Sequence, residues 1–104
     1  MNQMANMTME EMQVNAADAA QLLKAMSNEH RLLILCHLGQ SELSVGQLND
    51  LVALSQSSLS QHLARLRKDG LVNTRRESQT IYYSIAQPAI MKIIEVLHRE
   101  YCGQ

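Results

Sequence analysis

The chain is poor in the residues that build aromatic cores and covalent cross-links. Its 104 residues include no Trp, no Phe, three Tyr, one Pro and two Cys. The core therefore has to be built from Leu, Ile, Val, Ala and Met, and an aliphatic core of this kind suits packed helices. A chain of this length is expected to form one domain with a modest core, which a dimer interface would help to stabilise.

Long apolar runs and targeting signals are also missing. No stretch approaches the ~18 consecutive apolar residues that cross a bilayer. The first residues lack the basic start and apolar block of a secretory signal. These absences predict a cytoplasmic protein with no membrane partner. Thiols stay reduced in that compartment, so the pair Cys36 and Cys102 is better explained by regulation than by a structural staple.

The charges are few but unevenly placed. The formal net charge is −1, which argues against a protein that coats nucleic acid over its whole surface. Five of the nine Lys and Arg residues nevertheless fall within residues 65–76, whereas residues 1–15 carry two acids and no basic side chain. A compact basic patch on a nearly neutral protein favours binding to a specific DNA site. The five residues are Arg65, Arg67, Lys68, Arg75 and Arg76.

Capping signals and apolar spacing divide the chain into an arm and one domain. Residues 1–15 are rich in Met, Asn and Gln without clear periodicity, which predicts a flexible arm, and residues 16–103 form the domain. The fold class is mainly α with a β-hairpin wing, a winged helix-turn-helix of order ααααββα. The predicted elements are helices at 16–26, 28–39, 44–52 and 55–70, a hairpin at 71–85 and a helix that begins at Pro88.

The predicted helix at 55–70 has the pattern of a DNA-recognition helix. When its leucines at 59, 63 and 66 face the core, a turn of about 100° per residue points Ser57, Gln61, Arg65 and Lys68 the opposite way. A polar helix face is often merely solvated. Four serines within residues 55–60 weaken that interpretation, because serine is an indifferent helix former and a stable surface helix favours Glu and Lys.

The polar side chains of this helix and of the hairpin suit both parts of a DNA site. Small hydroxyls near a helix N-terminus let the backbone approach a phosphate. Gln61 can pair with adenine in the major groove, and arginine can pair with guanine. Arg75 and Arg76 can reach the DNA backbone or the minor groove from the hairpin.

Three segments resemble the ArsR/SmtB family of winged-helix repressors. They are the run Leu-Ser-Gln-Ser-Ser-Leu-Ser-Gln-His-Leu at 54–63, Asp-Gly-Leu-Val at 69–72, and the Tyr-Tyr strand at 82–83. The resemblance extends over residues 16–102. It implies a homodimer, built from the first and last helices, that binds imperfectly palindromic double-stranded operator DNA and releases it when an inducer binds. The predicted DNA-binding residues are Gln56, Ser57, Ser58, Ser60, Gln61, His62, Arg65, Lys68, Arg75, Arg76 and Gln79.

The chain departs from the metal-sensing members of that family. Ser44 and Gly46 stand where those members carry a Cys-x-Cys pair, and residues 88–92 offer no ligand where others bind zinc. We therefore predict no metal and no cofactor. A non-standard zinc set of Cys36, His37, His98 and Cys102 stays open, although adjacent side chains on a helix point about 100° apart.

The two cysteines resemble those of the sulfur-sensing subgroup of the family. That subgroup carries one cysteine in the second helix and one near the end of the last, and Cys36 and Cys102 occupy these places. The resemblance implies that persulfide or polysulfide inducers join the two sulfurs and that DNA is then released. From the residues alone, Cys36 is better explained as a small core residue, and the corresponding interpretation of Cys102 is an exposed tail thiol. The proximity of the two thiols comes from the resemblance.

The sequence as a whole predicts a repressor that senses reactive sulfur species through a Cys36–Cys102 dithiol switch. A zinc-responsive or general oxidant-responsive regulator of the same family is the alternative. An enzyme is not expected, because no Cys-x-x-Cys motif or nucleophile–base pair is present. A protein-interaction module that uses the fold without DNA is disfavoured by the basic cluster.

Overall fold

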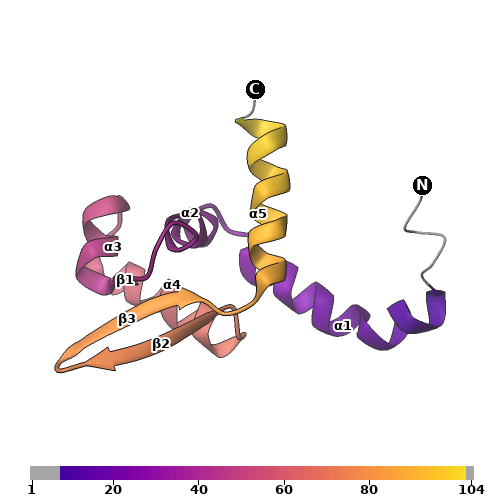
Figure 1. Ribbon diagram of the computed structural model, residues 1–104, viewed down its shortest axis with the longest axis horizontal. Coiled ribbons are helices and arrows are strands. Elements are labelled where there is room, and N and C mark those ends of the chain that lie inside the picture. Colours follow the sequence, from indigo (N-terminus) through magenta and orange to yellow (C-terminus); the bar gives the residue numbers. More distant parts are fainter. Residues whose placement is uncertain (1–7, 103–104) are drawn as a thin grey trace.

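The computed structural model describes residues 8–102 and has a predominantly helical body with a projecting hairpin (Figure 1). The strands form one antiparallel sheet in the order β1-β3-β2. The predicted winged-helix fold is therefore confirmed. The elements are α1 (Met9–Met26), α2 (Glu29–Leu38), β1 (Leu43–Ser44), α3 (Val45–Leu51), α4 (Gln56–Lys68), β2 (Val72–Glu77), β3 (Thr80–Ile85) and α5 (Pro88–Tyr101).

Helix α1 begins earlier than the sequence predicted. The Thr8 hydroxyl accepts a hydrogen bond from the backbone N–H of Glu11 at 3.0 Å, and the Glu11 carboxylate accepts one from the N–H of Thr8 at 3.4 Å. This capping box starts the helix, so residues 9–15, predicted as part of a flexible arm, lie in α1. Residues 1–7 of that predicted arm lie outside the described residues. The Thr-x-x-Glu spacing of Thr8 and Glu11 is the sequence signal that could have predicted this start of α1.

The caps predicted for the next three helices are confirmed. The Asn28 side chain accepts hydrogen bonds from two backbone N–H groups at the start of α2. Ser44 and Gln47 form a capping box at the start of α3, and Ser55 caps α4. Because the caps at Ser44 and Ser55 fix the starts of both helices of the helix-turn-helix locally, these starts could be found from sequence alone.

Strand β1 was not predicted. Its two residues pair with β3, Leu43 opposite Tyr83 and Ser44 opposite Tyr82. A two-residue strand cannot show the alternation that identifies longer strands. The pairing joins the segment before α3 to the wing, so the wing (β2, β3 and their turn at 78–79) is attached to the body along one edge.

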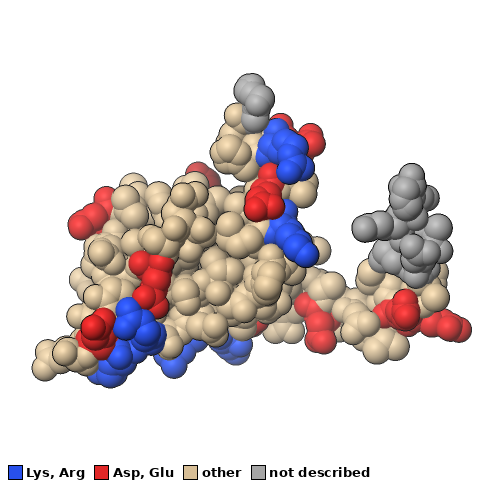
Figure 2. All heavy atoms as spheres, viewed as in Figure 1, with Lys and Arg blue, Asp and Glu red and all other residues tan. Residues whose placement is uncertain are grey.

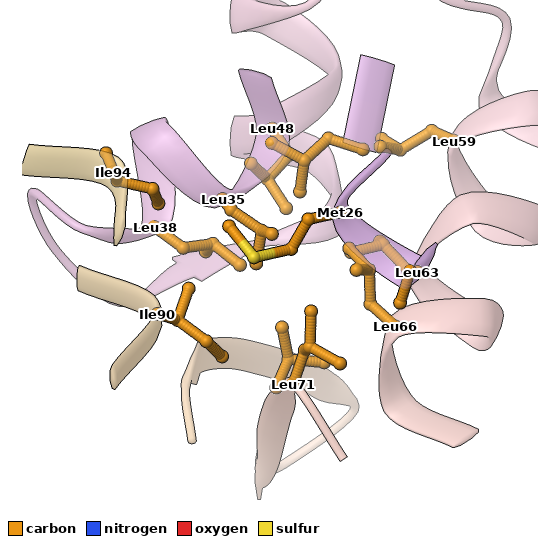
Figure 3. Packing of buried hydrophobic residues seen from close by; sticks show 13 residues of the cluster. Met26, Leu35, Leu38, Leu48, Leu59, Leu63, Leu66, Leu71, Ile90 and Ile94 are labelled. Atoms are coloured by element: carbon orange, nitrogen blue, oxygen red, sulfur yellow. The ribbon is translucent and has the colours of Figure 1, made fainter. Parts of the chain in front are cut away.

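The core is aliphatic, as the composition predicted. Met26 of α1, Leu35 of α2 and Leu48 of α3 meet the leucines of α4 in the centre of the molecule (Figure 3). The predicted inward stripe of α4 is fully buried. This packing fixes which face of α4 points outward. The thirteen buried residues are Ala25, Met26, Ile34, Leu35, Leu38, Leu48, Leu59, Leu63, Leu66, Leu71, Val72, Ile90 and Ile94.

The end of α4 requires a glycine. Gly70 has φ +80°, the left-handed region, and the following N–H, that of Leu71, donates to the Leu66 carbonyl at 2.9 Å. We expect Gly70→Ala to lower the free energy of unfolding by about 1–2 kcal/mol, because a Cβ disfavours this backbone conformation. Urea unfolding followed by circular dichroism measures the change. An unchanged midpoint and slope would show that the turn relaxes without cost.

In residues 8–102, no helix combines the length and the apolar character that crossing a membrane requires.

Candidate nucleic-acid interface and thiol pocket

The outward face of α4 is polar and free of acids. Gln56, Ser57, Ser60 and Gln61 are all exposed, and none of the thirteen residues of α4 is acidic. Lys68, near the end of the helix, is exposed as well. Figure 2 shows Lys and Arg side chains gathered along the lower edge of the molecule, over the wing and α4. A helix and a hairpin that share one basic edge can lie on DNA together.

His62 and Ser58 face the protein more than the sequence pattern suggested. The His62 ring lies 5.8 Å from that of His30, and its Nδ1 lies 3.4 Å from Arg31 Nη1. Burial, and then the charges of Arg31 and His30, lower the pKa of His62, which favours a neutral ring at neutral pH. Ser58 is half-buried, and its backbone N–H donates to the Ser55 hydroxyl.

Arg31, which no sequence pattern singled out, makes contacts that link three helices. Its Nε donates to the Ala25 carbonyl at 2.6 Å, and its Nη1 lies beside His62. It therefore connects the end of α1, the start of α2 and the middle of α4. Only the packing of three helices makes these contacts, so no local pattern could reveal them.

The Arg65 side chain is paired within the protein. Its Nε donates to Asp69 Oδ2 at 2.8 Å, and Asp69 also accepts a hydrogen bond from Gln21 of α1 at 3.1 Å. These two hydrogen bonds lower the pKa of the Asp69 carboxyl. Arg65 therefore points toward the C-terminal end of α4 and the neighbouring α1, where it lines a pocket with Lys24 and Lys68. The helical projection takes no account of hydrogen-bond partners, and it predicted that Arg65 points away from the protein on the polar face of α4.

The first arginine of the wing is paired as well, and the second is exposed. Arg75 makes two-pronged contact with Glu42, the shortest distance being 2.7 Å, and a further ion pair with Glu77 at 3.1 Å. Its guanidinium also lies 4.7 Å from the centre of the Tyr82 ring. Because Arg75 hydrogen-bonds Glu42, the pKa of that carboxyl is lowered. Arg76 and Gln79 are exposed. Glu42, which no sequence pattern marked as functional, holds the wing against the segment that leads into β1.

The two cysteines line one pocket between α2 and α5. Cys36 is half-buried on α2, and Cys102 is exposed at the C-terminal cap of α5. Both thiols are free. Burial raises the pKa of the Cys36 thiol, and the charge of Cys102 raises it further. The pocket has a volume of about 260 Å³ and an apolar lining. The remaining lining residues are Leu32, Leu33, Ile94, Leu97, His98 and Tyr101.

The non-standard zinc set is not assembled. His37 lines a different pocket, together with Glu29 and His30, and not the pocket of the two cysteines. Within residues 8–102, no three His, Cys, Asp or Glu side chains come together closely enough to hold a metal ion. As expected for neighbours on a helix, Cys36 and His37 point to different sides of α2.

The helix-turn-helix, the wing and the acid-free exposed face of α4 define a winged-helix DNA-binding protein. The sequence profile described as "Bacterial regulatory protein, arsR family" matches residues 28–74. The chain belongs to this family of transcription regulators, as its sequence motifs predicted. Its relatives are regulators and not enzymes.

Individual relatives match over nearly the whole chain. The transcriptional activator HlyU of Vibrio cholerae is 57% identical over 98 residues, covering 94% of this chain and 91% of its own. The structure of reduced HlyU from the same species superposes with a TM-score of 0.82 at 58% identity, covering 89% of this chain and 98% of that one. The repressor BigR of Xylella fastidiosa gives a TM-score of 0.85 at 37% identity, covering 94% and 100%.

Proposed function

We propose that this regulator is a cytoplasmic homodimeric repressor that releases operator DNA when reactive sulfur species join Cys36 to Cys102. The observation that carries the proposal is the shared pocket, because it is lined by both cysteines, Cys36 from α2 and Cys102 from the end of α5. A redox sensor needs a second thiol placed to resolve the first adduct. The match to a structure named as reduced HlyU adds support, since that name distinguishes a reduced form.

Exposed apolar side chains support the dimer. Helices α1 and α5 project from the body in different directions (Figure 1). Val14 of α1 is 80% exposed and Tyr101 of α5 is 83% exposed. Apolar surface of this extent favours burial against a second copy, which would place two α4 helices at successive major grooves. The other large apolar side chains exposed on these helices are Met9, Met12, Leu23 and Val96.

The proposed bridge forms in two balanced steps. A cysteine thiolate attacks the outer sulfur of a persulfide R–S–SH, the sulfur–sulfur bond breaks, and R–S⁻ leaves. The second cysteine then attacks the protein-bound sulfur of the first, and hydrosulfide leaves as the disulfide forms. The sulfane sulfur is reduced and the two thiols are oxidised. When both cysteines carry an added sulfur, the same attack leaves a trisulfide and releases one hydrosulfide.

The contacts of α2 offer a route from the bridge to DNA. A covalent bond between Cys36 and Cys102 restrains α5 against α2. Through Arg31, α2 contacts both the end of α1 and His62 of α4. A change in the angle of α2 thus changes the position of the recognition helix α4 relative to α1 and α5, the helices proposed to form the dimer. Two α4 helices at the wrong separation no longer fit successive major grooves.

Operator binding before and after inducer treatment tests the proposal. A duplex is first selected from random DNA by its affinity for the reduced protein. We expect an organic persulfide to weaken binding of this duplex by at least about tenfold, and dithiothreitol to restore it. Fluorescence anisotropy measures both. Retention of DNA after persulfide, or release by zinc alone in the reduced protein, would contradict the sulfur-sensing assignment.

The two wing arginines should behave differently on DNA. We expect Arg76→Ala to weaken binding to all DNA sequences. The fall of log affinity with log salt concentration should become less steep, by about one unit of slope for each phosphate that the side chain no longer neutralises. Arg75→Ala should change this slope less, because Glu42 and Glu77 already balance its charge. Anisotropy titrations at several salt concentrations compare the two variants. Equal slopes for both would show that the ion pairs of Arg75 open on DNA.

A further inference from the structure

Cys36 lies at the boundary between two pockets of different character. The apolar pocket between α2 and α5 contains Cys102. A second pocket, of about 540 Å³, is also lined by Cys36 and carries polar side chains from α5. His98 and Ile94 line both pockets, so the two spaces adjoin along α5. The lining residues of the second pocket are Cys36, Gln40, Met91, Ile94, Glu95, His98 and Arg99.

The polar groups of the second pocket are available for a ligand. Arg99 provides a positive charge, Glu95 a negative charge and Gln40 an amide. Within residues 8–102, none of these three side chains forms an ion pair or a hydrogen bond with another protein group. Arg65 and Arg75, by contrast, are already paired with acids. The pocket thus places an unused cation and an unused anion beside a thiol.

We propose that the second pocket binds the amino-acid group of a low-molecular-weight persulfide and presents its outer sulfur to Cys36. The carboxylate of the ligand pairs with Arg99, whose planar guanidinium suits two-pronged binding, and its ammonium pairs with Glu95. A purely anionic inducer such as inorganic disulfide, the HS–S⁻ ion, would need only the positive charge of Arg99. The presence of both charges favours a zwitterionic carrier. This inference rests on the proposed function of the two thiols.

Binding of the carrier molecule offsets the low reactivity of the Cys36 thiol. Cys36 is half-buried, and burial raises the pKa of its thiol, so little thiolate is present at neutral pH. A bound reagent reacts faster than a free one because its sulfur is held in place. The Cys36 thiolate attacks the outer sulfur, the carrier leaves as a thiolate, and Cys102 completes the bridge from the apolar pocket with loss of hydrosulfide.

Rates of bridge formation with two kinds of sulfur donor test the inference. The variants are Arg99→Gln, Glu95→Gln and, as a matched control, Lys92→Gln, which removes an exposed cation of α5 that lines neither pocket. The donors are cysteine persulfide, glutathione persulfide and inorganic disulfide. Intact mass spectrometry of quenched samples gives each rate. The glutathione arm reports whether the pocket also accepts a carrier whose amino-acid group lies farther from the sulfur.

Because Arg99 and Glu95 are exposed, we expect Arg99→Gln and Glu95→Gln to slow the reaction with cysteine persulfide by about fivefold, the upper range for an ion pair of exposed side chains. Reaction with inorganic disulfide should change less than about twofold, and Lys92→Gln should match the wild type with every donor. S-methylcysteine, which cannot react, should slow the wild-type reaction competitively. Equal slowing of organic and inorganic donors, or no slowing, would overturn the pocket assignment. Absence of any bridge in the wild type would instead overturn the proposed dithiol switch.

Discussion

Cys36→Ser and Cys102→Ser are each expected to bind operator DNA as the wild type does and to remain bound in the presence of an organic persulfide. Neither thiol makes a contact with the exposed face of α4, so the reduced protein should lose little; an affinity within about twofold of wild type is expected. The response should disappear completely, because one thiol cannot form an intramolecular bridge. Anisotropy with and without persulfide measures both properties.

Each single variant is the control for the other. Both retain one thiol that can accept a sulfur atom, so each should still gain about 32 mass units per added sulfur, visible in the intact mass, without releasing DNA. Such a result separates modification from bridging. Full release of DNA from either variant would show that one modified cysteine suffices, and it would contradict the paired-thiol mechanism.

Gln61→Ala should reduce the discrimination between operator and unrelated DNA by the contribution of one base contact. Gln61 is exposed on α4, on the face opposite the buried leucines. A good contact between a side chain and a base contributes about 1–3 kcal/mol of discrimination, roughly 5- to 150-fold. Alanine is a strong helix former, so α4 itself should persist.

Competition between two DNA duplexes isolates this effect. We expect the affinity of Gln61→Ala for the selected operator to fall while its affinity for a scrambled duplex stays within about twofold of wild type. The scrambled duplex thus serves as the control for folding and for phosphate contacts. An equal loss on both duplexes would assign Gln61 to the DNA backbone, and no loss on either would remove it from the interface.

The parts of the fold that could be predicted from the sequence are those that local chemistry determines. The caps at Asn28, Ser44 and Ser55 fix helix starts without help from distant residues. The leucines of α4 face the core because their spacing matches the helical repeat. The start of α1 was missed although Thr8 and Glu11 carry the capping signal. The two-residue β1 forms only because β3 lies beside it.

The site was predictable in its residue types and less so in its pairings. Helical projection identified the outward face of α4, but it could not show that Arg65 pairs with Asp69 or that Arg75 pairs with Glu42. The partner of Arg65 is set by the way α4 ends, and the partner of Arg75 is set by a contact between segments that are distant in sequence. The proximity of Cys36 and Cys102 likewise depends on how α5 packs against α2. Periodicity along one helix contains no information about that packing, and a family resemblance was needed to anticipate it.

The most direct measurement is intact mass spectrometry of the wild-type protein after treatment with an organic persulfide, followed by peptide mapping without reductant. The proposed mechanism predicts the mass of a single polypeptide chain in which Cys36 and Cys102 are joined to each other. The bridge is either a disulfide, which makes the chain two hydrogens lighter, or a bridge that contains one or more added sulfur atoms. Dithiothreitol should return the mass to that of the untreated protein. Persulfide adducts on separate cysteines with no crosslinked peptide, or a crosslink only between two chains, would contradict the account.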